Sequence, residues 1–370
     1  MSTLRAAIVG TGFMGAVHAR SIAAAGGELV AVMGSTSEKG RQAAAALGAA
    51  HGVASIAEAV DEGIDVLHVC TPNATHAGYA REALEAGVAV VCEKPLATDV
   101  VTAAELTDLA ARQGLVATVP FVYRFYASVR DARARLRVPG HRPPWLLHGS
   151  YLQDWLADST ATNWRVDPAA GGATRAFGDI GVHWCDLAEF VTGQRITRVC
   201  ARFGRAAETR PDATGASMPV ATEDGAVVAF ETDAGALGSV VVSQATAGRK
   251  NALSFSFDGP DTSYAFCQET PESLWIGGRD TNQVVLRDPT RPGAPVGRSA
   301  TLPAGHPQGY YEVFADFVAD TYAAVRGEPV EGLPMFADGL RAARITDAVV
   351  ASAAKQAWVD VAQPAQEANP

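Results

Sequence analysis

The sequence predicts an α/β protein in which a parallel sheet is followed by a second α/β domain with an open, mainly antiparallel sheet. In the first third of the chain, short apolar runs alternate with helical patterns of about 12 residues, as in βαβ units. From Ile196 onward, short segments alternate polar and apolar residues with a period of two, which indicates strands with one buried face. We therefore expect residues 1–125 to form the first domain and residues 126–370 the second.

The strands and helices of the first domain follow one another in a regular order. The first strand, residues 5–9, is apolar and leads through glycines into a helix over residues 13–25. Residues 88–91 are all apolar, as expected for a strand in a sheet that is covered on both faces. Further strands are predicted at residues 29–33, 66–70, 89–92 and 116–119, and further helices at residues 40–47, 75–86 and 100–113.

The second domain has a different pattern. A polar loop at residues 139–144 leads into a strand near residues 146–151, and residues 253–257 alternate cleanly between apolar residues and serine. Residues 237–244 alternate in part. Two segments are polar and contain Pro and Gly, so we expect loops at residues 209–223 and 288–303. Two helices, over residues 312–326 and 336–357, close the domain.

Composition excludes several classes of protein. With 48% apolar and 19% charged residues, the chain is neither disordered nor a coiled coil. Its 30 basic and 40 acidic residues give a net charge of −10, and they form no basic cluster. We therefore expect neither a nucleic acid nor an anionic membrane as a partner. No apolar stretch reaches the roughly 18 residues that span a bilayer.

The five cysteines indicate a reducing compartment. They are odd in number, widely spaced and include no C-x-x-C pair, so we predict neither a zinc ribbon nor any other metal site. Free thiols in a large apolar chain fit the cytosol. The apolar run that begins a few residues after Met1 leaves no room for a cleaved signal peptide. The sequence therefore predicts a cytoplasmic protein.

A glycine-rich loop follows the first strand. Residues 10–15 have the pattern G-x-G-x-x-G between a strand and a helix. In that setting Gly10 allows a tight turn, Gly12 lets a pyrophosphate approach the backbone, and Gly15 lets helix and strand pack closely. Phe13 and Met14 complete the predicted cofactor contacts of this loop. The loop predicts a dinucleotide site, and the alternative is a glycine-rich turn without a ligand.

The residues after the second strand bear on the choice of cofactor. An NAD site carries an acid about 20 residues past the glycine-rich loop, where this chain has hydroxyl residues, Ser35 and Thr36. Lys39 and Arg41 follow shortly after. Hydroxyls and cations suit a 2′-phosphate. We therefore predict NADP, with NAD as the alternative; the structural alternative is an ordinary helix cap with solvated charges.

Three further motifs follow along the chain. Residues 71–76 read Thr-Pro-Asn-Ala-Thr-His after the strand at residues 66–70, residues 93–95 read Glu-Lys-Pro after the next strand, and residues 179–186 have the pattern D-x-G-x-H-x-x-D. Together with the glycine-rich loop, these motifs resemble the Gfo/Idh/MocA oxidoreductase family over nearly the whole chain. The resemblance implies a Rossmann domain followed by an α/β domain whose open sheet usually mediates oligomerisation.

The resemblance implies three catalytic residues. Lys94 corresponds to the active-site lysine of the family, and Asp179 and His183 correspond to its paired acid and histidine. A lysine at the carboxyl end of a parallel strand can stabilise a developing alkoxide. Asp179 and His183 are four residues apart, so on a helix they share one face, where the carboxylate can orient an imidazole that removes a hydroxyl proton. The alternatives are a solvated lysine and a helix cap beside a core histidine.

Further cofactor contacts are implied by the same resemblance. Trp164 and Arg165 match a pair that in relatives lies against the nicotinamide end; the alternative is a packed aromatic beside a surface arginine. His76 begins a helix near the cofactor, where direct contact and a capping or packing role both remain open. The motifs after the two strands are expected to line the cofactor channel with Thr71, Pro72, Asn73, Glu93 and Lys94.

The substrate contacts are predicted from chemistry and from sugar-oxidising relatives. Gln153, Asp154 and Trp155 combine an amide, an acid and an aromatic ring, a set that suits carbohydrates. A late segment, residues 306–311, is similar to one that approaches the ligand in those relatives, and for each set a purely structural role is the alternative. The predicted substrate-binding set is Lys94, Tyr123, Gln153, Asp154, Trp155, Asp179, His183, His306 and Tyr310.

The resemblance implies an NAD(P)-dependent oxidoreductase that transfers a hydride between the nicotinamide and a carbohydrate or cyclitol hydroxyl or ketone. Two alternatives use the same fold: a redox-cycling enzyme that cleaves glycosides, and a non-catalytic NAD(P) or sugar sensor. Lys94 and His183 are both present, which favours an enzyme over a sensor. Fold alone does not decide among the three, because function depends on the site.

Two structural expectations complete the sequence analysis. We predict a homodimer or homotetramer, because the period-two sheet has one apolar face, with Leu253, Phe255 and Phe257, and because this sheet pairs in the family. An outer face that is also apolar must be covered as well. We also expect a cis peptide bond between Lys94 and Pro95, although only about 5% of such bonds are cis in folded proteins.

Overall fold

The chain divides into two compact units in a computed structural model that describes residues 3–161, 163–212, 214–291, 298 and 302–363. Unit 1 comprises Met1–Asp131, Ala169–Gly171 and Leu286–Leu340, and unit 2 comprises Ala132–Pro168, Gly172–Val285 and Arg341–Pro370. The division into domains after residue 125 stays a prediction, since a domain is defined by independent folding and a compact unit by its contacts.

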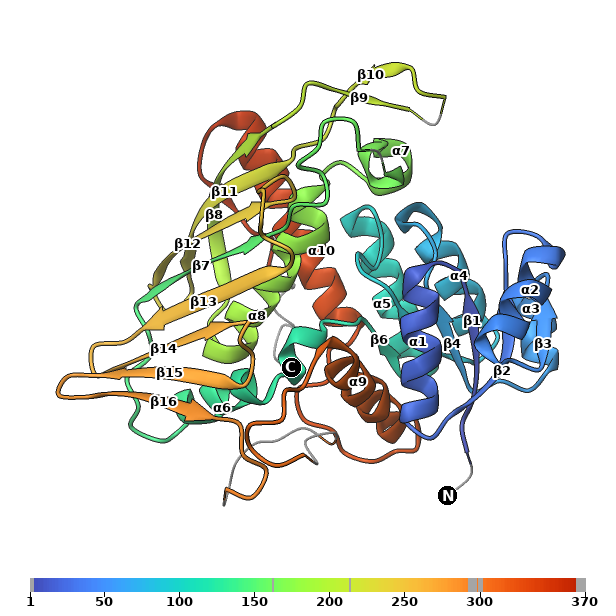
Figure 1. Ribbon diagram of the computed structural model, residues 1–370, viewed down its shortest axis with the longest axis horizontal. Coiled ribbons are helices and arrows are strands. Elements are labelled where there is room, and N and C mark those ends of the chain that lie inside the picture. Colours follow the sequence, from blue (N-terminus) through green and yellow to red (C-terminus); the bar gives the residue numbers. More distant parts are fainter. Residues whose placement is uncertain (1–2, 162, 213, 292–297, 299–301, 364–370) are drawn as a thin grey trace, which may run out of the picture. The chain divides into compact units, whose positions relative to one another are not determined.

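Unit 1 is built on a six-stranded sheet (Figure 1) in the order β3-β2-β1-β4-β5-β6. All neighbouring strands are parallel, which confirms the predicted parallel sheet. The strand order reverses between β1 and β4, and ligands bind at the carboxyl ends of strands at such a point. The strands are β1 (Arg5–Val9), β2 (Glu28–Met33), β3 (His51–Val53), β4 (Val66–Val69), β5 (Ala89–Cys92) and β6 (Ala117–Thr118).

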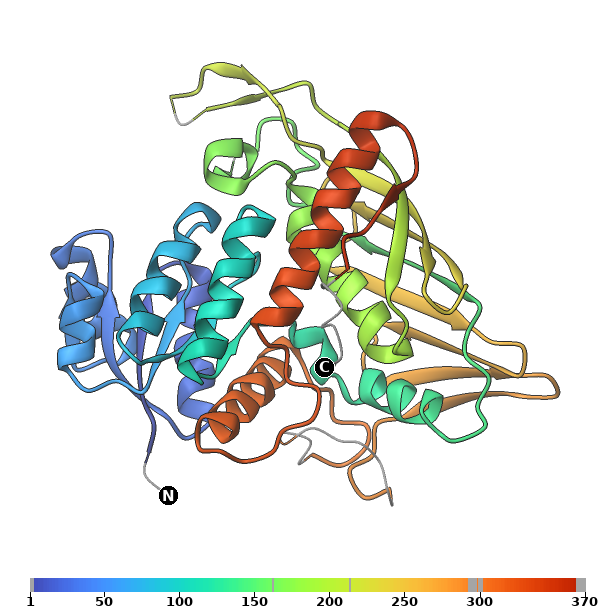
Figure 2. The same cartoon turned by 180° about the vertical axis from the view of Figure 1, so that it is seen from behind.

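Helices cover both faces of this sheet, as the apolar strands require. Helices α1 (Phe13–Ala24) and α9 (Tyr310–Val325) pack against each other, and α4 (Asn73–Glu85) and α5 (Val100–Gln113) form a second packed pair. Figure 1 shows the first pair in front of the sheet, and the reversed view in Figure 2 shows the second. The shorter helices of unit 1 are α2 (Ser37–Leu47), α3 (Ile56–Asp61) and η1 (Val122–Phe125). Helix α6 (Ala127–Leu136) contains residues of both units.

Two short elements of unit 1 differ from the sequence analysis. Strand β3 has three residues and helix α3 has six, and neither was predicted. Both are too short for a hydrophobic period to show. The strand at Val66–Val69 is therefore the fourth along the chain rather than the third.

Unit 2 contains a nine-stranded sheet in the order β16-β15-β14-β13-β7-β12-β11-β8-β17. Strands β7 and β12 are parallel, and the other recorded pairs of neighbours are antiparallel, which confirms an open, mainly antiparallel sheet. The strands are β7 (Leu146–Leu152), β8 (Ile196–Gly204), β11 (Gly225–Thr232), β12 (Leu237–Ser243), β13 (Ala252–Asp258), β14 (Thr262–Cys267), β15 (Ser273–Gly278), β16 (Asn282–Leu286) and β17 (Val359–Asp360).

One face of this sheet is covered by helix α8 (Val182–Thr192). The apolar residues of β13, Leu253, Phe255 and Phe257, are buried. Trp184 of α8 is also fully buried, and its indole N–H donates to the backbone oxygen of Ser254 at 2.9 Å. This hydrogen bond and the packing of the ring fix α8 on the sheet, since a buried indole needs both.

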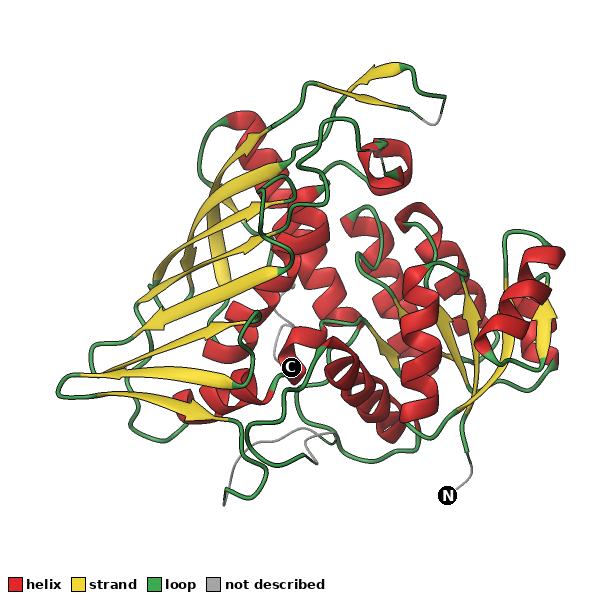
Figure 3. Ribbon diagram, viewed as in Figure 1, coloured by secondary structure: helices red, strands yellow, loops and turns green. Residues whose placement is uncertain are grey.

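The remaining elements of unit 2 are short, apart from the last helix. The loop predicted at residues 209–223 contains two strands, β9 (Thr209–Pro211) and β10 (Ser217–Pro219), which pair apart from the large sheet (Figure 3). Residue 213 of that loop, and residues 292–297 and 299–301 of the loop predicted at 288–303, lie outside the described residues. The other elements of unit 2 are η2 (Trp164–Val166) and η3 (Phe177–Gly181). Helices α7 (Pro168–Gly171) and α10 (Phe336–Lys355) contain residues of both units.

Two findings bear on the expected cellular setting. Cys70, Cys92, Cys185, Cys200 and Cys267 are all free thiols. Across the described part of the chain, no helix combines the length and the apolar character needed to cross a membrane.

Candidate active site

The glycine-rich loop has the geometry that its pattern predicts. Gly10 has a φ of +105°, and a Cβ at this residue would lie 2.5 Å from the backbone oxygen of Cys70. A Cβ on Gly15 would lie 2.3 Å from the backbone oxygen of Gly10, so only glycine allows this close packing of helix on strand. A Cβ on Gly12 would meet no described atom within 4 Å, which leaves space beside the backbone.

The N-terminus of helix α1 fits an anion. Gly12 is the N-cap residue of this helix, and among the described residues no side chain forms a capping hydrogen bond with it. Its free backbone N–H groups and the helix dipole favour a phosphate at this end. The loop therefore fits the pyrophosphate of a dinucleotide. Phe13 is largely exposed and Met14 is half-buried, so both lie at the surface of the loop.

The segment after β2 brings a cation and a hydroxyl together. The Lys39 ammonium lies 3.2 Å from the Ser35 hydroxyl, and the Thr36 hydroxyl accepts from the backbone N–H of Lys39 at 3.2 Å, which caps α2. Arg41 is instead bound to Glu38 at 2.5 Å, and this hydrogen bond lowers the pKa of Glu38. Lys39 is therefore the cation beside the hydroxyls, whereas the charge of Arg41 is already paired.

The motifs after β4 and β5 lie at one edge of the sheet, because neighbouring parallel strands end at the same edge. His76 joins them: its two ring nitrogens lie 2.7 Å from the backbone oxygen of Pro95 and 2.8 Å from that of Thr71. Burial lowers the pKa of His76, against the effect of these two hydrogen bonds. Both ring nitrogens are thus engaged with backbone, and direct contact of His76 with a cofactor stays a prediction.

Lys94 lies two residues after the end of β5, at the same sheet edge as the glycine-rich loop. The peptide bond between Lys94 and Pro95 is cis, as predicted. The Lys94 side chain is half-buried, and its backbone N–H donates to the carboxylate of Glu93 at 3.2 Å. Asn73, the first residue of α4, donates to the backbone oxygen of Gly171 at 2.9 Å. Thr71 and Pro72 precede α4 beside this edge.

A buried chain of hydrogen bonds holds Glu93. His18 of α1 lies 3.2 Å from Glu93 and 2.8 Å from His68 of β4, and His68 lies 3.0 Å from the hydroxyl of Tyr322 in α9. Burial lowers the pKa of His68 well below its ordinary value, and His18 adds to this shift. Burial tends to raise the pKa of Glu93, but the hydrogen bond from His18 and nearby cationic groups outweigh it and hold the pKa low. Glu93 is therefore an ionised acceptor.

Asp179 and His183 lie where two kinds of helix meet. Asp179 belongs to η3, a π-helical turn, and His183 to the first turn of α8. The sequence analysis expected a single regular helix and missed this turn, because the spacing of two residues does not distinguish the two geometries. Such π turns are rare and are frequently found at functional sites. The ring of His183 lies beside that of Tyr151, with 6.4 Å between centroids.

The Asp179 carboxylate has two polar neighbours from other elements. The amide nitrogen of Gln244 donates to Oδ2 at 2.7 Å, and Nε of Arg165 lies 3.5 Å from Oδ1. The Arg165 guanidinium also stacks on the ring of Trp164, 4.3 Å from its centroid. The predicted pair Trp164 and Arg165 is thus joined to Asp179. Gln244 was not predicted as a site residue, because only its position at the end of β12 reveals the contact.

Glu223 anchors the segment that carries Asp179. Its carboxylate accepts from the Thr174 hydroxyl at 2.5 Å and from the backbone N–H groups of Arg175, at 3.1 Å, and Phe177, at 2.9 Å. A carboxylate in this place caps the start of the helical segment and complements its dipole. The sequence analysis placed Glu223 in a loop and gave it no role.

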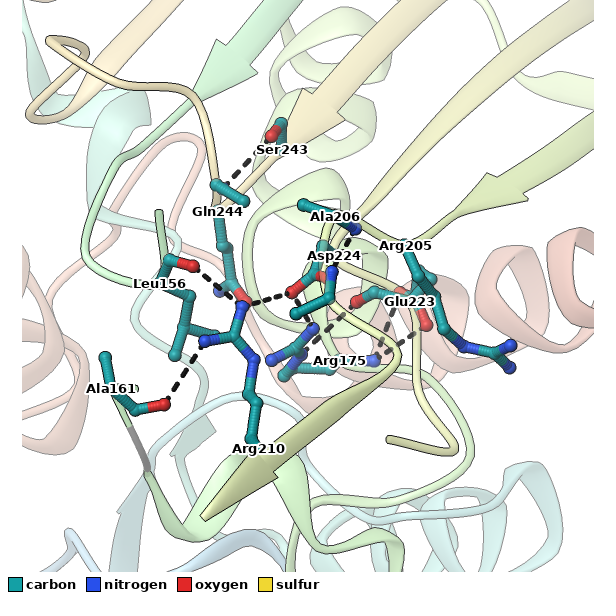
Figure 4. Close-up of polar contacts among 12 residues, drawn as sticks. Leu156, Ala161, Arg175, Arg205, Ala206, Arg210, Glu223, Asp224, Ser243 and Gln244 are labelled. Atoms are coloured by element: carbon teal, nitrogen blue, oxygen red, sulfur yellow. Dashed lines mark hydrogen bonds and ion pairs between the residues drawn. The ribbon is translucent and has the colours of Figure 1, made fainter. Parts of the chain in front are cut away.

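Asp224, the next residue, lies between two buried arginines (Figure 4). Its carboxylate is bound by Arg175 and, at 3.1 Å, by Arg210. Burial tends to raise the pKa of Asp224, but the backbone N–H groups of Ala206 and Ala207 and the charge of Arg175 hold it below its ordinary value. Arg210 also donates to the backbone oxygens of Leu156, at 2.7 Å, Asp158, at 2.8 Å, and Ala161, at 3.2 Å. This network fixes the loop that follows Trp155.

Two of the predicted substrate residues of unit 2, Gln153 and Trp155, belong to one hydrogen-bonded group. Gln153 donates to Asn251 at 2.8 Å and accepts from the indole N–H of Trp155 at 2.9 Å. The hydroxyl of Tyr151 donates to the same oxygen of Asn251 at 2.8 Å. The Lys250 ammonium, 2.6 Å from Asp154, holds the pKa of that carboxyl below its ordinary value. Asp154 is thus paired outside this group.

Besides Lys94, the predicted substrate residues of unit 1 are Tyr123, His306 and Tyr310. The rings of Tyr123 and Tyr310 lie 6.5 Å apart between centroids, at the start of α9. Tyr123 is buried, whereas His306 is exposed, and one ring nitrogen of His306 lies 3.2 Å from the backbone oxygen of Pro303. The structure brings the buried Tyr123 and the half-buried Tyr310 together within unit 1.

These features define an α/β protein with a dinucleotide-binding loop and a lysine at the same sheet edge. A family model described as "Oxidoreductase family, NAD-binding Rossmann fold" matches residues 4–121, and a model of the GFO/IDH/MocA C-terminal domain matches residues 143–265. The chain belongs to the Gfo/Idh/MocA family of oxidoreductases, as the sequence motifs indicated.

Relatives of this chain act on sugars and cyclitols. Levoglucosan dehydrogenase of Pseudarthrobacter phenanthrenivorans is 30% identical over 391 residues, which cover 98% of this chain and 99% of that protein. A structure of levoglucosan dehydrogenase with NADH and levoglucosan has a TM-score of 0.90 and 29% identity, and it covers 98% of this chain and 100% of that one. An inositol dehydrogenase homologue from Azotobacter vinelandii, with NADH and myo-inositol, has a TM-score of 0.82, 25% identity and coverage of 97% and 98%.

Proposed function

We propose that this oxidoreductase transfers a hydride between a nicotinamide dinucleotide and a hydroxyl or ketone carbon of a carbohydrate or cyclitol. The observation that carries the proposal is the position of Lys94 at the sheet edge where the glycine-rich loop offers an anion site. Similarity over the full length to a levoglucosan dehydrogenase supports the substrate class. We assign cofactor binding to residues 1–125 and substrate binding to residues 126–370.

In the proposed chemistry, one residue of this chain accepts a proton from the substrate and another stabilises the negative charge that develops on the substrate oxygen. When bound, the nicotinamide accepts the hydride from the carbon that carries the hydroxyl. His183 takes the hydroxyl proton, and Lys94 donates a hydrogen bond to the oxygen while charge develops on it. Asp179 favours the protonated ring of His183 and fixes its orientation. In the direction of reduction, His183 returns the proton to the oxygen.

The remaining predicted residues receive supporting roles in this proposal. Gln153 and Trp155 hold each other, so the ring of Trp155 can offer a rigid face to the C–H side of a sugar. Tyr123, Asp154, His306 and Tyr310 remain proposed substrate contacts. We place Trp164 and Arg165 near the nicotinamide, together with Thr71, Pro72, Asn73, His76 and Glu93. The free thiols support a cytoplasmic location.

A panel of sugars, cyclitols and anhydrosugars tests the proposed function. The absorbance of the reduced cofactor is followed with NADP and with NAD, in both directions where a ketone is available. We expect at least one compound to give stoichiometric reduction of the cofactor. Turnover of a glycoside without net reduced cofactor would instead show the redox-cycling enzyme, and binding of a sugar without any turnover would show the sensor.

The cofactor preference is the first prediction within this proposal. We expect NADP to bind more tightly than NAD by roughly 10- to 150-fold, because a charge-assisted phosphate contact contributes about 1.5–3 kcal/mol. Lys39→Ala should reduce this ratio more than Arg41→Ala, since Arg41 is paired with Glu38. Titration of both oxidised cofactors measures the ratio, with Arg112→Ala on helix α5 as the control. Equal or tighter binding of NAD by the wild type contradicts the prediction.

The outer face of the large sheet in unit 2 supports a homodimer or homotetramer. Val227 of β11 and Val241 of β12 are direct partners across the two strands, and they are 55% and 41% exposed. Leu237 and Trp275 are also exposed, at 52% and 36%. Contiguous apolar patches are rare on monomers, so a second copy of the chain is the proposed cover.

We expect sedimentation at micromolar concentration to give a multiple of the 38.4 kDa chain mass. Val241→Glu should lower the mass toward that of one chain, because it places a charge in the buried contact. Val138→Glu, at a residue that is 58% exposed and outside the sheet, is the control and should leave the mass unchanged. A mass of one chain for the wild type contradicts the prediction.

A further inference from the structure

We propose that Gln244 is a positioning residue that sets the direction and the charge state of the Asp179 carboxylate. Gln244 follows β12 and is fully buried, with an exposed fraction of 0%. Its amide nitrogen donates to Oδ2 of Asp179 at 2.7 Å. The inference rests on the proposed function, because it assigns Asp179 to the catalytic machinery.

Two backbone hydrogen bonds fix the main chain of Gln244, and therefore the position from which its side chain extends. Its N–H donates to the backbone oxygen of Asp224 at 2.9 Å, and its C=O accepts from the N–H of Leu156 at 3.0 Å. Asp224 is itself bound by the two buried arginines (Figure 4). The ion-pair network and the loop after Trp155 therefore meet at Gln244.

The amide of Gln244 is oriented toward a negative charge. Its nitrogen faces Asp179, and its oxygen is buried without a hydrogen-bond partner among the described residues. An unpaired buried oxygen costs free energy, and turning the amide would place that oxygen against the carboxylate. Gln244 thus keeps the orientation that favours ionised Asp179. Arg165 of η2 lies near the other oxygen of the Asp179 carboxylate, and its positive charge also favours the ionised form. His183 follows four residues later, in α8.

The place of Asp179 in the fold explains why it needs this contact. Asp179 lies in a π turn, where the backbone does not follow the regular α-helical path. Glu223 fixes the start of that segment through the backbone N–H groups of Arg175 and Phe177. Gln244 and Arg165 instead contact the tip of the Asp179 side chain, each at one carboxylate oxygen.

Gln244→Glu gives a test that depends on protonation. A protonated glutamic acid at this position can donate a hydrogen bond to Asp179, as the amide does, whereas an ionised glutamate repels the Asp179 carboxylate. Because the two carboxyl groups are adjacent, they share a proton, and the apparent pKa values belong to the pair. We expect kcat relative to the wild type to be highest at acid pH and to fall about 10- to 100-fold as the pair ionises. Gln244→Met should show the lower kcat at every pH. The Kd of the oxidised cofactor should stay within twofold of the wild type.

Gln194→Glu is the matched control. Gln194 is also a buried glutamine of unit 2, but its amide binds the backbone oxygen of Pro144 at 2.8 Å and the Thr232 hydroxyl at 2.7 Å. It should cost stability without adding a pH-dependent loss of relative kcat. The proposal is overturned if Gln244→Met keeps the turnover of the wild type, or if Gln244→Glu and Gln194→Glu have the same pH profile.

A measurement of stability separates this proposal from the proposed function. At pH 8, Asp179→Asn should raise the midpoint of urea unfolding of the Gln244→Glu variant, because it removes one of two facing negative charges. In the wild type, which has no second negative charge at this place, the same substitution should lower the midpoint or leave it unchanged. This double-mutant comparison needs no substrate. If no sugar is turned over but the coupling is present, the proposed function fails and the contact stands. If the coupling is absent, the positioning role of Gln244 fails, whatever the enzyme does.

Discussion

Lys94→Ala and His183→Ala are each expected to lower kcat by about 10²- to 10⁴-fold. A positioned general base contributes a factor of this size, and so does a donor that stabilises an oxyanion. The Kd of the oxidised cofactor should stay nearly unchanged, because the glycine-rich loop and the N-terminus of α1 are intact in both variants. Kinetics with the best substrate of the panel measures the first effect, and a fluorescence titration of the cofactor measures the second.

Lys355→Ala, in the last turn of α10, is the control for loss of a lysine charge and should keep the turnover of the wild type. If both Lys94→Ala and His183→Ala keep more than about a tenth of the rate, neither residue has the role proposed for it. In that case the sensor function gains support, since a sensor needs the ligand site without the chemistry.

Asp224→Asn is expected to destabilise the protein by about 3–5 kcal/mol, because it leaves two buried guanidinium groups without their counter-charge. The side chains of Arg175, Arg210 and Asp224 are at most 3% exposed. Urea unfolding at pH 7 measures the loss. Asp261→Asn is the control, since it removes an exposed ion pair with Arg142 and should change the midpoint far less.

The same variant has a predictable dependence on pH. The pKa of Asp224 is lower in the folded protein than in the unfolded chain, so its contribution is fully present above the unfolded value of about 3.9 and is lost as pH falls through the folded value. The difference in unfolding free energy between wild type and Asp224→Asn should therefore narrow below about pH 4. A difference that stays constant into acid would show that the charge of Asp224 is not what stabilises the network.

The sequence predicted those parts of the site whose causes are local. Gly10 has a φ of +105°, which favours glycine by itself, and a Cβ on Gly15 would meet the backbone oxygen of Gly10 within the same loop, so a short pattern carries the information. Lys94 lies two residues after an apolar strand, and the parallel sheet places the end of that strand at the same edge as the loop. The parallel sheet and the mainly antiparallel sheet followed from hydrophobic periods of several residues.

The parts that were missed depend on residues far apart in the chain. Gln244 meets Asp179 across 65 positions, and Asp224 meets Arg175 across 49. Neither contact leaves a mark in the local sequence, where Gln244 is only the last residue of an alternating segment. The π turn at Phe177–Gly181 was missed for a different reason, since its residues have no property that separates it from an ordinary helix.

Helix α9 determines when unit 1 can finish folding while the chain is being synthesised. It packs on α1 and supplies Tyr322, whose hydroxyl meets His68 across 254 positions of the chain. When the ribosome has made only the parallel strands, the face of α1 that meets α9 is still open to water, and His68 lacks its contact with the Tyr322 hydroxyl. Unit 1 therefore cannot close until nearly the whole chain has been translated, which makes this enzyme a poor candidate for folding from its N-terminus and exposes the nascent chain to chaperones.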